Sequence, residues 1–227
     1  MWENFHFESN EDTSLDWLHH GLQHGTLLWV TDGSHIPKRG PTVSGAAWVV
    51  TDKVSRKTMA CSFAETSPIA DSYRAETIGL YSIHVFIKAL FEHYSLDSGT
   101  VEICCDNETA LRTAEGRPKR VSTGIASADV FRGIRAITRS IPRLNWTYTW
   151  VKAHMDEVLP WADLTRPQQL NVMCDNLAKQ AVVRVLDKSD DDQAAPSCQL
   201  LPLENCAVFI DGVKQTSDPE NIKLNSF

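Results

Sequence analysis

The fold of this chain is decided by one stretch, Leu27-Leu28-Trp29-Val30-Thr31-Asp32-Gly33-Ser34. The residues before Asp32 form a short, almost wholly apolar run, which is typical of a buried central strand followed by a turn. A strand that ends in an aspartate exposes its carboxylate at the carboxyl edge of the sheet, where open α/β sheets bind their ligands. We therefore expect Asp32 to belong to a functional site.

Three further segments place a carboxylate where a predicted element begins or ends. They are Tyr73-Arg74-Ala75-Glu76, Cys104-Cys105-Asp106-Asn107 and Met173-Cys174-Asp175-Asn176. Four carboxylates that converge on one point repel each other strongly unless something cancels their charge. Two divalent cations would cancel it, and such a pair can cleave phosphodiesters. Oxygen ligands of this kind suit Mg²⁺ or Mn²⁺.

Each acid taken alone also has a structural explanation. Asp32 fits a turn, Asp106 fits a helix cap, and Asp175 fits a solvent-facing helix residue. Glu76 lies in the first turn of a predicted helix and points towards the sheet, where a carboxylate needs a partner. The joint occurrence of the four acids, in this order and on these elements, favours a shared site.

The hydrophobic pattern predicts an α/β fold with a five-stranded mixed sheet and helices on both faces. Strands are predicted over residues 27–32, 43–51, about 57–65, 101–105 and 144–151. Helices are predicted from 73 to about 90, after 107 to about 114, from 127 or 129 with an apolar face that reaches Ile137, and over about 168–186. The first three strands form an antiparallel meander, and the last two add in parallel. If the first and fourth strands pair, Asp32 and Asp106 become neighbours.

Composition divides the chain into three parts. Residues 1–26 form an acidic lead-in with the apolar spacing of one short helix, residues 27–186 form the domain, and residues 187–227 form an acidic linker and C-terminal tail with a predicted β-hairpin. The net charge of −7 comes from the flanks, because residues 27–186 hold 19 Lys and Arg against 16 Asp and Glu. The domain can therefore still face phosphate.

No membrane span is expected, because no apolar run approaches about eighteen residues. The N-terminus is acidic and lacks a signal pattern. The six cysteines include no Cys-x-x-Cys pair, so we expect reduced, mostly buried thiols and no zinc knuckle. These features predict an intracellular protein and do not distinguish the nucleus from the cytoplasm.

Five short motifs follow one another along the chain: Thr31-Asp32-Gly33-Ser34, Tyr73-Arg74-Ala75-Glu76, Cys105-Asp106-Asn107, Val151-Lys152-Ala153-His154 and Cys174-Asp175-Asn176-Leu177-Ala178-Lys179. Together they resemble type 1 ribonuclease H domains, of the kind that retrotransposons carry beside a reverse transcriptase. The resemblance covers about residues 25–186. It implies the ribonuclease H fold and endonucleolytic cleavage of the RNA strand of RNA–DNA hybrids. It also implies two Mg²⁺ ions, with Mn²⁺ as a substitute, held by Asp32, Glu76, Asp106 and Asp175.

The resemblance also assigns a role to His154, which matches the family's mobile histidine in the loop after the fifth strand. The implied role is proton transfer or help with product departure, which suits an imidazole because its pKa is near neutrality. Gly33 and Ser34 would let the RNA backbone come close, and Asn107 would offer a hydrogen bond. The implied partners are an RNA–DNA hybrid and a reverse transcriptase domain, and the oligomeric state stays open.

The pattern departs from the family in the length of one loop. His154 and Asp175 are 21 positions apart, which is more than we expect in compact bacterial members. The loop between them also offers rival ligands, which are Asp156, Glu157 and Asp163. Asp175 is preferred because Leu170-Asn171 and Asn176-Leu177-Ala178 frame it as the family's last-helix motif.

Two other functions fit the same fold. One is a catalytically silent module that binds nucleic acid or a protein partner. The other is a different nuclease, such as an integrase or transposase core, against which Glu76 and His154 favour ribonuclease H. Basic side chains that are candidates for gripping phosphates, unless they form only a solvated helix face, are Arg117, Lys119, Arg120, Arg132, Arg135 and Arg139.

Overall fold

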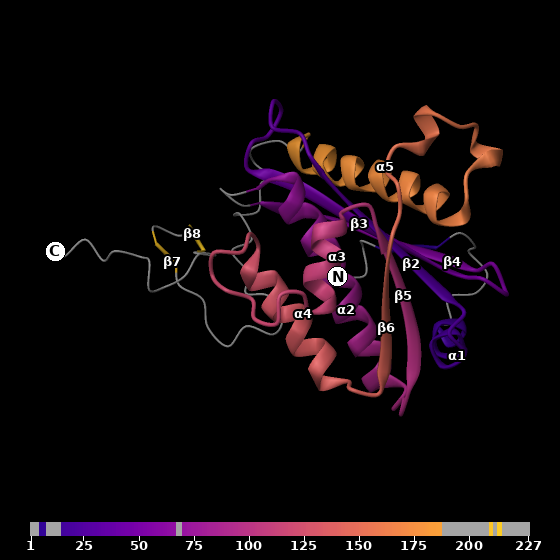
Figure 1. The fold of residues 1–227 in the computed structure, drawn as a ribbon. Helices are drawn as coiled ribbons and strands as arrows, with labels where there is room; N and C mark the ends of the chain where they lie inside the picture. The colour runs from indigo at the N-terminus through magenta and orange to yellow at the C-terminus, as the bar shows by residue number, and fades with distance from the viewer. Residues whose placement is uncertain (1–4, 8–14, 67–69, 188–208, 211–212, 215–227) are drawn as a thin grey trace.

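A mixed six-stranded sheet forms the centre of the protein (Figure 1). The structure is a computed structural model that describes residues 5–7, 15–66, 70–187, 209–210 and 213–214. The strands are Phe5–Phe7 (β1), Leu27–His35 (β2), Val43–Asp52 (β3), Thr58–Thr66 (β4), Gly99–Cys105 (β5) and Leu144–Trp150 (β6). Across the sheet they lie in the order β1-β4-β3-β2-β5-β6.

The predicted five-stranded arrangement is confirmed, and the sheet has one strand more. β2, β3 and β4 form an antiparallel meander, while β5 and β6 add in parallel on the other side of β2. The additional strand, β1, pairs antiparallel with β4, although the sequence pattern predicted no strand in the lead-in. Three residues are too few to display the alternation by which a strand is recognised.

Helices cover both faces of the sheet (Figure 1). They are α1 (Asp16–His24), α2 (Ser72–His93), α3 (Glu108–Glu115), α4 (Ala128–Ser140) and α5 (Arg166–Leu186), with the short 3₁₀ helices η2 (Met155–Glu157) and η3 (Trp161–Asp163). α2 and α4 share one apolar core with Trp29 and Ile103. α5 shares a second core with Val30 and Cys104, which follow those residues in β2 and β5 and point to the opposite face.

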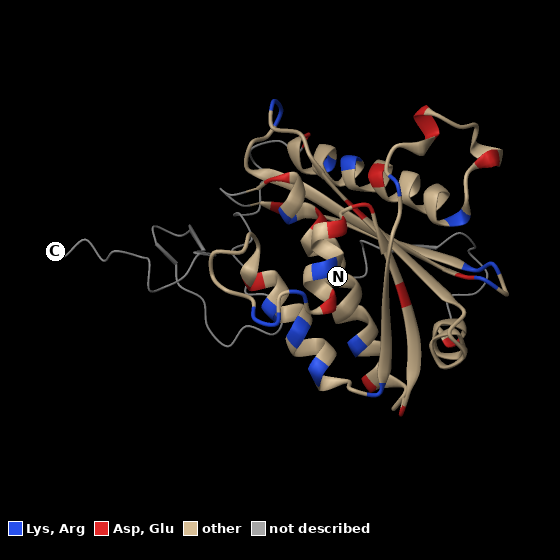
Figure 2. Cartoon of the chain, in the orientation of Figure 1, with Lys and Arg blue, Asp and Glu red and all other residues tan. Residues whose placement is uncertain are grey.

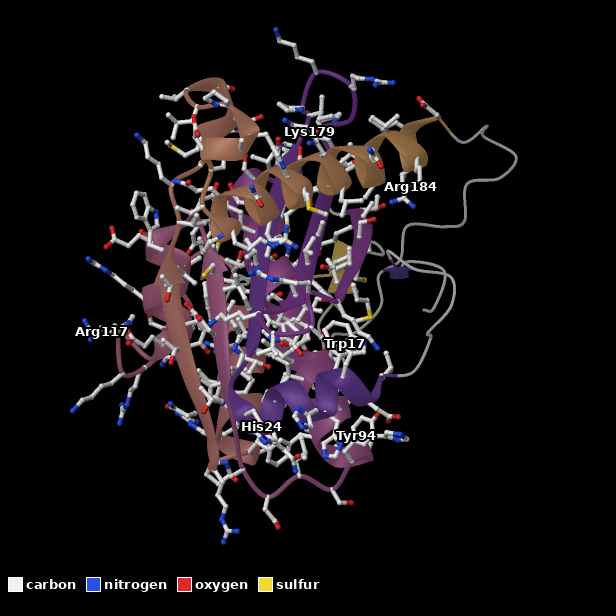
Figure 3. All side chains as sticks on the ribbon, turned by 90° about the vertical axis from the view of Figure 1, so that its right-hand side faces the viewer. Trp17, His24, Tyr94, Arg117, Lys179 and Arg184 are labelled. Carbon is white, nitrogen blue, oxygen red and sulfur yellow. The ribbon has the colours of Figure 1, made fainter. Side chains whose placement is uncertain are left out.

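The two flanks are described only in part. α1 packs beside β5, and its surface carries Trp17 and His24, with Tyr94 at the end of α2 close by (Figure 3). Strands β7 (Phe209–Ile210) and β8 (Val213–Lys214) pair antiparallel, where the sequence predicts a hairpin. The linker over residues 188–208 lies outside the described residues, and so do Cys198 and Cys206.

Two global expectations can be compared with the described residues. The cysteines Cys61, Cys104, Cys105 and Cys174 are free and buried, as expected for reduced thiols. Among the described helices, none is both long enough and apolar enough to cross a membrane.

The place of α2 is fixed by its first turn and its apolar face. Asp71 caps the helix by accepting a hydrogen bond from the Arg74 backbone N–H at 2.6 Å. Leu80, Ile83 and Ile87 are buried along one face, so the helix lies against the sheet. This docking brings the first turn of α2 to β2.

Strand β2 runs past Asp32 to His35, so the predicted end of this strand is wrong. Its antiparallel pairing with β3 continues to the last residue, because an Asp-Gly pair favours a turn without requiring one. The parallel pairing of β2 with β5, in contrast, ends at Thr31 and Cys105. Asp32 on β2 and Asp106 directly after β5 are therefore the next residues beyond the last parallel pair, and they are neighbours as expected.

A buried histidine lies where α2 meets β6. The His84 ring is fully buried, with Nδ1 2.7 Å from the Leu80 carbonyl and Nε2 2.7 Å from the Tyr148 hydroxyl. It stacks on the Trp146 ring with 4.6 Å between centroids. Because a carbonyl only accepts, Nδ1 carries the proton and Nε2 accepts from the tyrosine. Burial lowers the pKa of His84 to about 4.

We predict that His84 destabilises the protein in mild acid. The folded ring stays neutral down to about pH 4, whereas the unfolded ring takes up a proton near about pH 6.5, so stability is lost as the pH falls through this window. In urea unfolding, the stability difference between wild type and His84→Gln should shrink by about 2 kcal/mol from about pH 7.5 to about pH 5. His20→Gln, at an exposed position, is the control, and an unchanged difference at His84 would contradict the prediction.

Candidate active site

Acidic side chains from four elements meet where the parallel pairing of β2 and β5 ends. They are Asp32 on β2, Glu76 in the first turn of α2, Asp106 directly after β5 and Asp175 on α5. Asp32 is only 5% exposed. Carboxylate oxygens of Glu76 and Asp106 lie within 4.8 Å of each other and of the Cys105 thiol. Glu76 and Asp106 therefore form the centre of the site.

The pKa of Asp32 is raised to about 8. Burial is the largest cause, and the charges of Asp106, Asp175 and Glu76 add to it. The Gly33 backbone N–H, 2.7 Å from Oδ1, opposes the shift. All three other acids thus lie close enough to Asp32 to affect its ionisation.

Glu76 and Asp106 are perturbed in the same direction. Burial, followed by the charge of Asp106, raises the pKa of Glu76 to about 7, and a hydrogen bond from Asn107 opposes the shift. Burial also raises the pKa of Asp106, and the charge of Asp175 adds to this effect. Carboxylates whose ionisation is opposed by burial and by one another's charge favour the approach of a cation.

The donor set fits a hard divalent cation. Glu76 Oε2 is buried and has no hydrogen-bond partner among the described residues, which is unfavourable unless a ligand occupies it. Carboxylate oxygens are the ligands that Mg²⁺ and Mn²⁺ prefer. Burial holds the pKa of the Cys105 thiol well above its usual range, so the thiol stays protonated and donates to Asp106 Oδ1 at 3.8 Å. Cys105 therefore orients Asp106 through a hydrogen bond, and the carboxylates remain as the ligands for the cation.

Asp175 lies at the rim of the site. Its charge raises the pKa of Asp32 and of Asp106, but neither Asp175 nor Asp32 is among the groups that lie within 4.8 Å of one another around Glu76. Lys179, one turn further along α5 (Figure 3), places its Nζ 2.6 Å from Asp175 Oδ2. The Asp175 carboxylate thus faces the other acids and is shared with a lysine.

The loop that carries His154 projects from the domain. His154 has a left-handed backbone with φ of 50° and precedes η2. Its exposed ring places Nδ1 4.0 Å from Glu157 Oε1, and its charge lowers the pKa of Asp106, against the larger effect of burial. The predicted histidine therefore lies within electrostatic reach of the acids. The rival ligands Asp156, Glu157 and Asp163 are exposed. Figure 2 shows acidic positions on the loop that projects beside α5.

The three predicted substrate contacts serve the protein's own structure. A Cβ at Gly33 would lie 2.3 Å from the Glu76 backbone nitrogen, so glycine allows α2 to approach β2. Ser34 is buried. Asn107 caps α3 by accepting the Ala110 N–H at 3.0 Å and also bonds Glu76. Contact of these residues with RNA stays a prediction, while their part in building the site is visible.

Two neighbours of the acids were not predicted as site residues. Asn171 is buried on α5 and its Nδ2 lies 3.4 Å from Asp32 Oδ2. Trp150 donates through Nε1 to the Asp106 carbonyl at 2.8 Å. Asn171 precedes Asp175 by one helical turn, so the i, i+4 spacing could have indicated it. Trp150 gave no such signal, because only the pairing of β5 with β6 brings it to Asp106.

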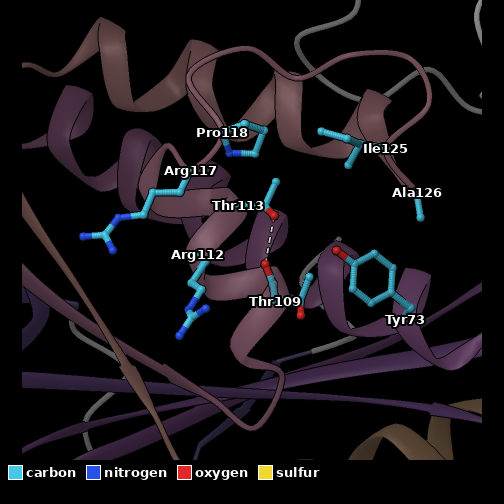
Figure 4. A pocket seen from close by; sticks show the side chains of 8 residues that line it. All are labelled: Tyr73, Thr109, Arg112, Thr113, Arg117, Pro118, Ile125 and Ala126. Carbon is cyan, nitrogen blue, oxygen red and sulfur yellow. Dashed lines mark hydrogen bonds between the residues drawn. The ribbon is translucent and has the colours of Figure 1, made fainter.

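A cavity of about 690 Å³ opens near the acids (Figure 4). Its walls are the start of α2, the helix α3 and the loop over residues 116–127. Two arginines line it, and each is paired with an acid: Arg112 with Glu108 at 2.6 Å and Arg117 with Glu115 at 3.5 Å. The lining residues are Tyr73, Thr109, Arg112, Thr113, Arg117, Pro118, Ile125 and Ala126. Tyr73 precedes Glu76 by one helical turn and feels its charge, but none of the four acids lines the cavity.

Arg135 does not belong to the candidate phosphate contacts. It is buried, and it donates to the backbone carbonyls of Thr113 at 3.1 Å and of Lys119 at 3.0 Å. It therefore holds the loop over residues 116–127 in place. The prediction was wrong for Arg135 because regular spacing of basic residues does not say which of them faces inward. The other candidates, Arg117, Lys119, Arg120, Arg132 and Arg139, are exposed.

The protein has the ribonuclease H fold. It is similar to LC11 ribonuclease H1, isolated from compost by a metagenomic approach and solved with an RNA/DNA hybrid, with a TM-score of 0.53 and 18% identity over 70% of this chain and 99% of that chain. It is also similar to the prototype foamy virus protease-reverse transcriptase, with a TM-score of 0.50 and 15% identity over 69% of this chain and 21% of that chain. No protein-family model matches the sequence, and no curated protein sequence matches it. The likeness confirms the fold that the motifs imply.

We predict that removing one acid stabilises the protein in the absence of divalent cations. Asp106→Asn removes a charge that raises the pKa of Asp32 and of Glu76, and carboxylates with a raised folded pKa destabilise the fold above that pKa. Unfolding in chelator at about pH 8.5 should show a gain of about 1–3 kcal/mol, which disappears near about pH 5. Asp97→Asn, at an exposed position, is the control, and a loss of stability in Asp106→Asn would contradict the prediction.

Proposed function

We propose that the protein is a metal-dependent ribonuclease H that hydrolyses the RNA strand of RNA–DNA hybrids. The observation that carries this proposal is the buried, unpartnered Glu76 Oε2 beside Asp106, at a sheet edge where the charges of Asp32 and Asp175 converge. A buried oxygen without a donor is available to a cation, and four carboxylates supply enough charge for two. Mg²⁺ is the proposed cofactor, and Mn²⁺ is a substitute.

The chain's own residues divide the work between holding ions and moving a proton. The proposed cation ligands are Asp32, Glu76, Asp106 and Asp175. When bound, paired cations activate water and stabilise the oxygens of an in-line displacement at phosphorus. His154, exposed on its loop and within reach of Asp106, would exchange the proton with the reacting oxygen. Cys105 and Asn107 hold Asp106 and Glu76 in position.

The cavity and the fold support the choice of substrate class. Arg112 and Arg117 would contact phosphates, and Tyr73 and Ile125 offer apolar surface to sugars and bases. We place the scissile strand at the acids and its complement at the cavity. LC11 ribonuclease H1 was solved with an RNA/DNA hybrid, and a similar domain occurs in the prototype foamy virus protease-reverse transcriptase. These likenesses support the hybrid as substrate and an origin beside a reverse transcriptase.

One contact favours a second candidate, the catalytically silent binding module. Lys179 lies 2.6 Å from Asp175 Oδ2, so an ammonium group already neutralises part of the charge that would attract a second cation. A protein that uses the acidic edge only to bind nucleic acid or a partner would retain such a pair. The cleavage experiment separates the two candidates.

We predict that the wild-type protein cuts the RNA strand of a labelled RNA–DNA hybrid in Mg²⁺ and that chelation abolishes cutting. Asp106→Asn should reduce cleavage to background, because it removes a central carboxylate of the cluster. His154→Ala should lower the rate about 10²-fold or more, the usual contribution of a positioned acid or base. The readout is the initial rate on a denaturing gel.

The controls distinguish the rival functions. Asp97→Asn should cut as the wild type does, since Asp97 is exposed on a surface loop. Hybrid binding in gel-shift assays without cutting, in both wild type and Asp106→Asn, would establish the silent module instead. Nicking or strand transfer on double-stranded DNA would indicate an integrase-like nuclease.

A further inference from the structure

A buried arginine connects three elements next to the acids. Arg74 lies in the first turn of α2 and is 3% exposed. Its Nε donates to both carboxylate oxygens of Glu65 on β4 at 3.1 Å, and Nη2 donates to one of them at 3.0 Å. Its Nη1 and Nη2 also donate to the two oxygens of Asp129 on α4, each at 3.1 Å. One guanidinium therefore ties α2 to the sheet and to α4.

The composition of this network indicates a geometric role. Arg74 brings two carboxylates, Glu65 and Asp129, to one guanidinium close to a site that is already acidic. A buried ion network adds little stability over apolar residues of the same shape. A planar guanidinium, however, meets two carboxylates in fixed directions, which the ammonium of lysine cannot reproduce. The network of Arg74, Glu65 and Asp129 thus fixes the position of the first turn of α2 relative to β4 and α4.

The position that it specifies is that of Glu76, two residues further along the same turn. The Arg74 N–H donates to Asp71 at 2.6 Å, and the Arg74 carbonyl accepts the Thr77 hydroxyl at 2.9 Å. On the side of the sheet, Gly33 approaches so closely that a Cβ there would lie 2.3 Å from the Glu76 nitrogen. The turn is therefore held both by its own hydrogen bonds and by the sheet, and the arginine network anchors it to α4.

We propose that Arg74 is a positioning residue for the cation site. By fixing the first turn of α2 to Glu65 and Asp129, it holds Glu76 Oε2 beside Asp106, where the two carboxylates can share a cation. The inference rests on the proposed function. It gives Glu65 and Asp129 an influence on cation affinity although neither belongs to the four acids.

Arg74→Lys tests the proposal, because lysine keeps the positive charge but lacks the planar guanidinium that bonds both carboxylates. Calorimetric titration of the full chain with Mn²⁺, without nucleic acid, should give a dissociation constant about tenfold above that of the wild type. Asp129→Asn leaves Arg74 paired with Glu65 and should raise the constant by a smaller factor. In cleavage assays, the Mg²⁺ concentration for half-maximal rate should rise by a similar factor, whereas the rate at saturating Mg²⁺ should fall less.

The matched control is Leu90→Ala, a buried position near the far end of the same helix. This substitution lowers stability by leaving a cavity, but it does not touch the first turn. With all variants held well below their melting temperatures, Leu90→Ala should bind Mn²⁺ as the wild type does. A loss of affinity in Arg74→Lys without a loss in Leu90→Ala supports positioning over general destabilisation.

Other results overturn the inference. Equal Mn²⁺ affinity in wild type and Arg74→Lys, or an equal loss in Leu90→Ala, removes the positioning role. If Arg74→Lys does not fold, Asp129→Asn decides by the same comparison. A wild-type chain that binds no Mn²⁺ and cuts no hybrid overturns the proposed function and this inference with it. If the wild type binds Mn²⁺ and cuts the hybrid, and the Arg74→Lys and Asp129→Asn variants bind Mn²⁺ equally well, only the role of Arg74 is overturned.

Discussion

The parallel pairing of β2 with β5 is the constraint on which the site depends. It ends at Thr31 and Cys105, so the next residues, Asp32 and Asp106, are neighbours at one edge of the sheet. Two carboxylates in this arrangement repel each other, and burial makes the repulsion stronger. The apolar cores on the two faces of the sheet must offset this cost, which makes the acidic edge an unstable part of an otherwise well-packed fold.

The residues around the acids separate into a rigid group and an exposed one. Glu76 and Asp106 are held by packed backbone and by hydrogen bonds from Asn107 and Cys105. His154, in contrast, stands on a projecting loop with its ring exposed. This division suits the proposed chemistry, because cation ligands need fixed spacing whereas a proton carrier must reach the substrate and leave it.

Much of the fold could be predicted from the sequence because its signals are local. The apolar run before Asp32, the cap at Asp71 and the apolar stripe of α2 each depend on residues close in sequence. The predicted end of β2 was wrong. The Asp-Gly pair favoured a turn after Asp32, but pairing with β3 extends the strand to His35. The strand β1 was missed because three residues carry too little pattern. Arg135 was predicted to contact phosphates but faces inward, because the spacing of basic residues does not define which of them are buried.

By itself, the sequence predicted the order of the five central strands and their helices and named four candidate acids, because periodicity and residue chemistry are properties of short segments. Only the tertiary structure decided how those acids interact. It placed Glu76 and Asp106 at the centre, left Asp175 at the rim beside Lys179, and brought Asn171 to Asp32. Such contacts join residues far apart in the chain, so they depend on strand register and helix packing, which no short segment encodes.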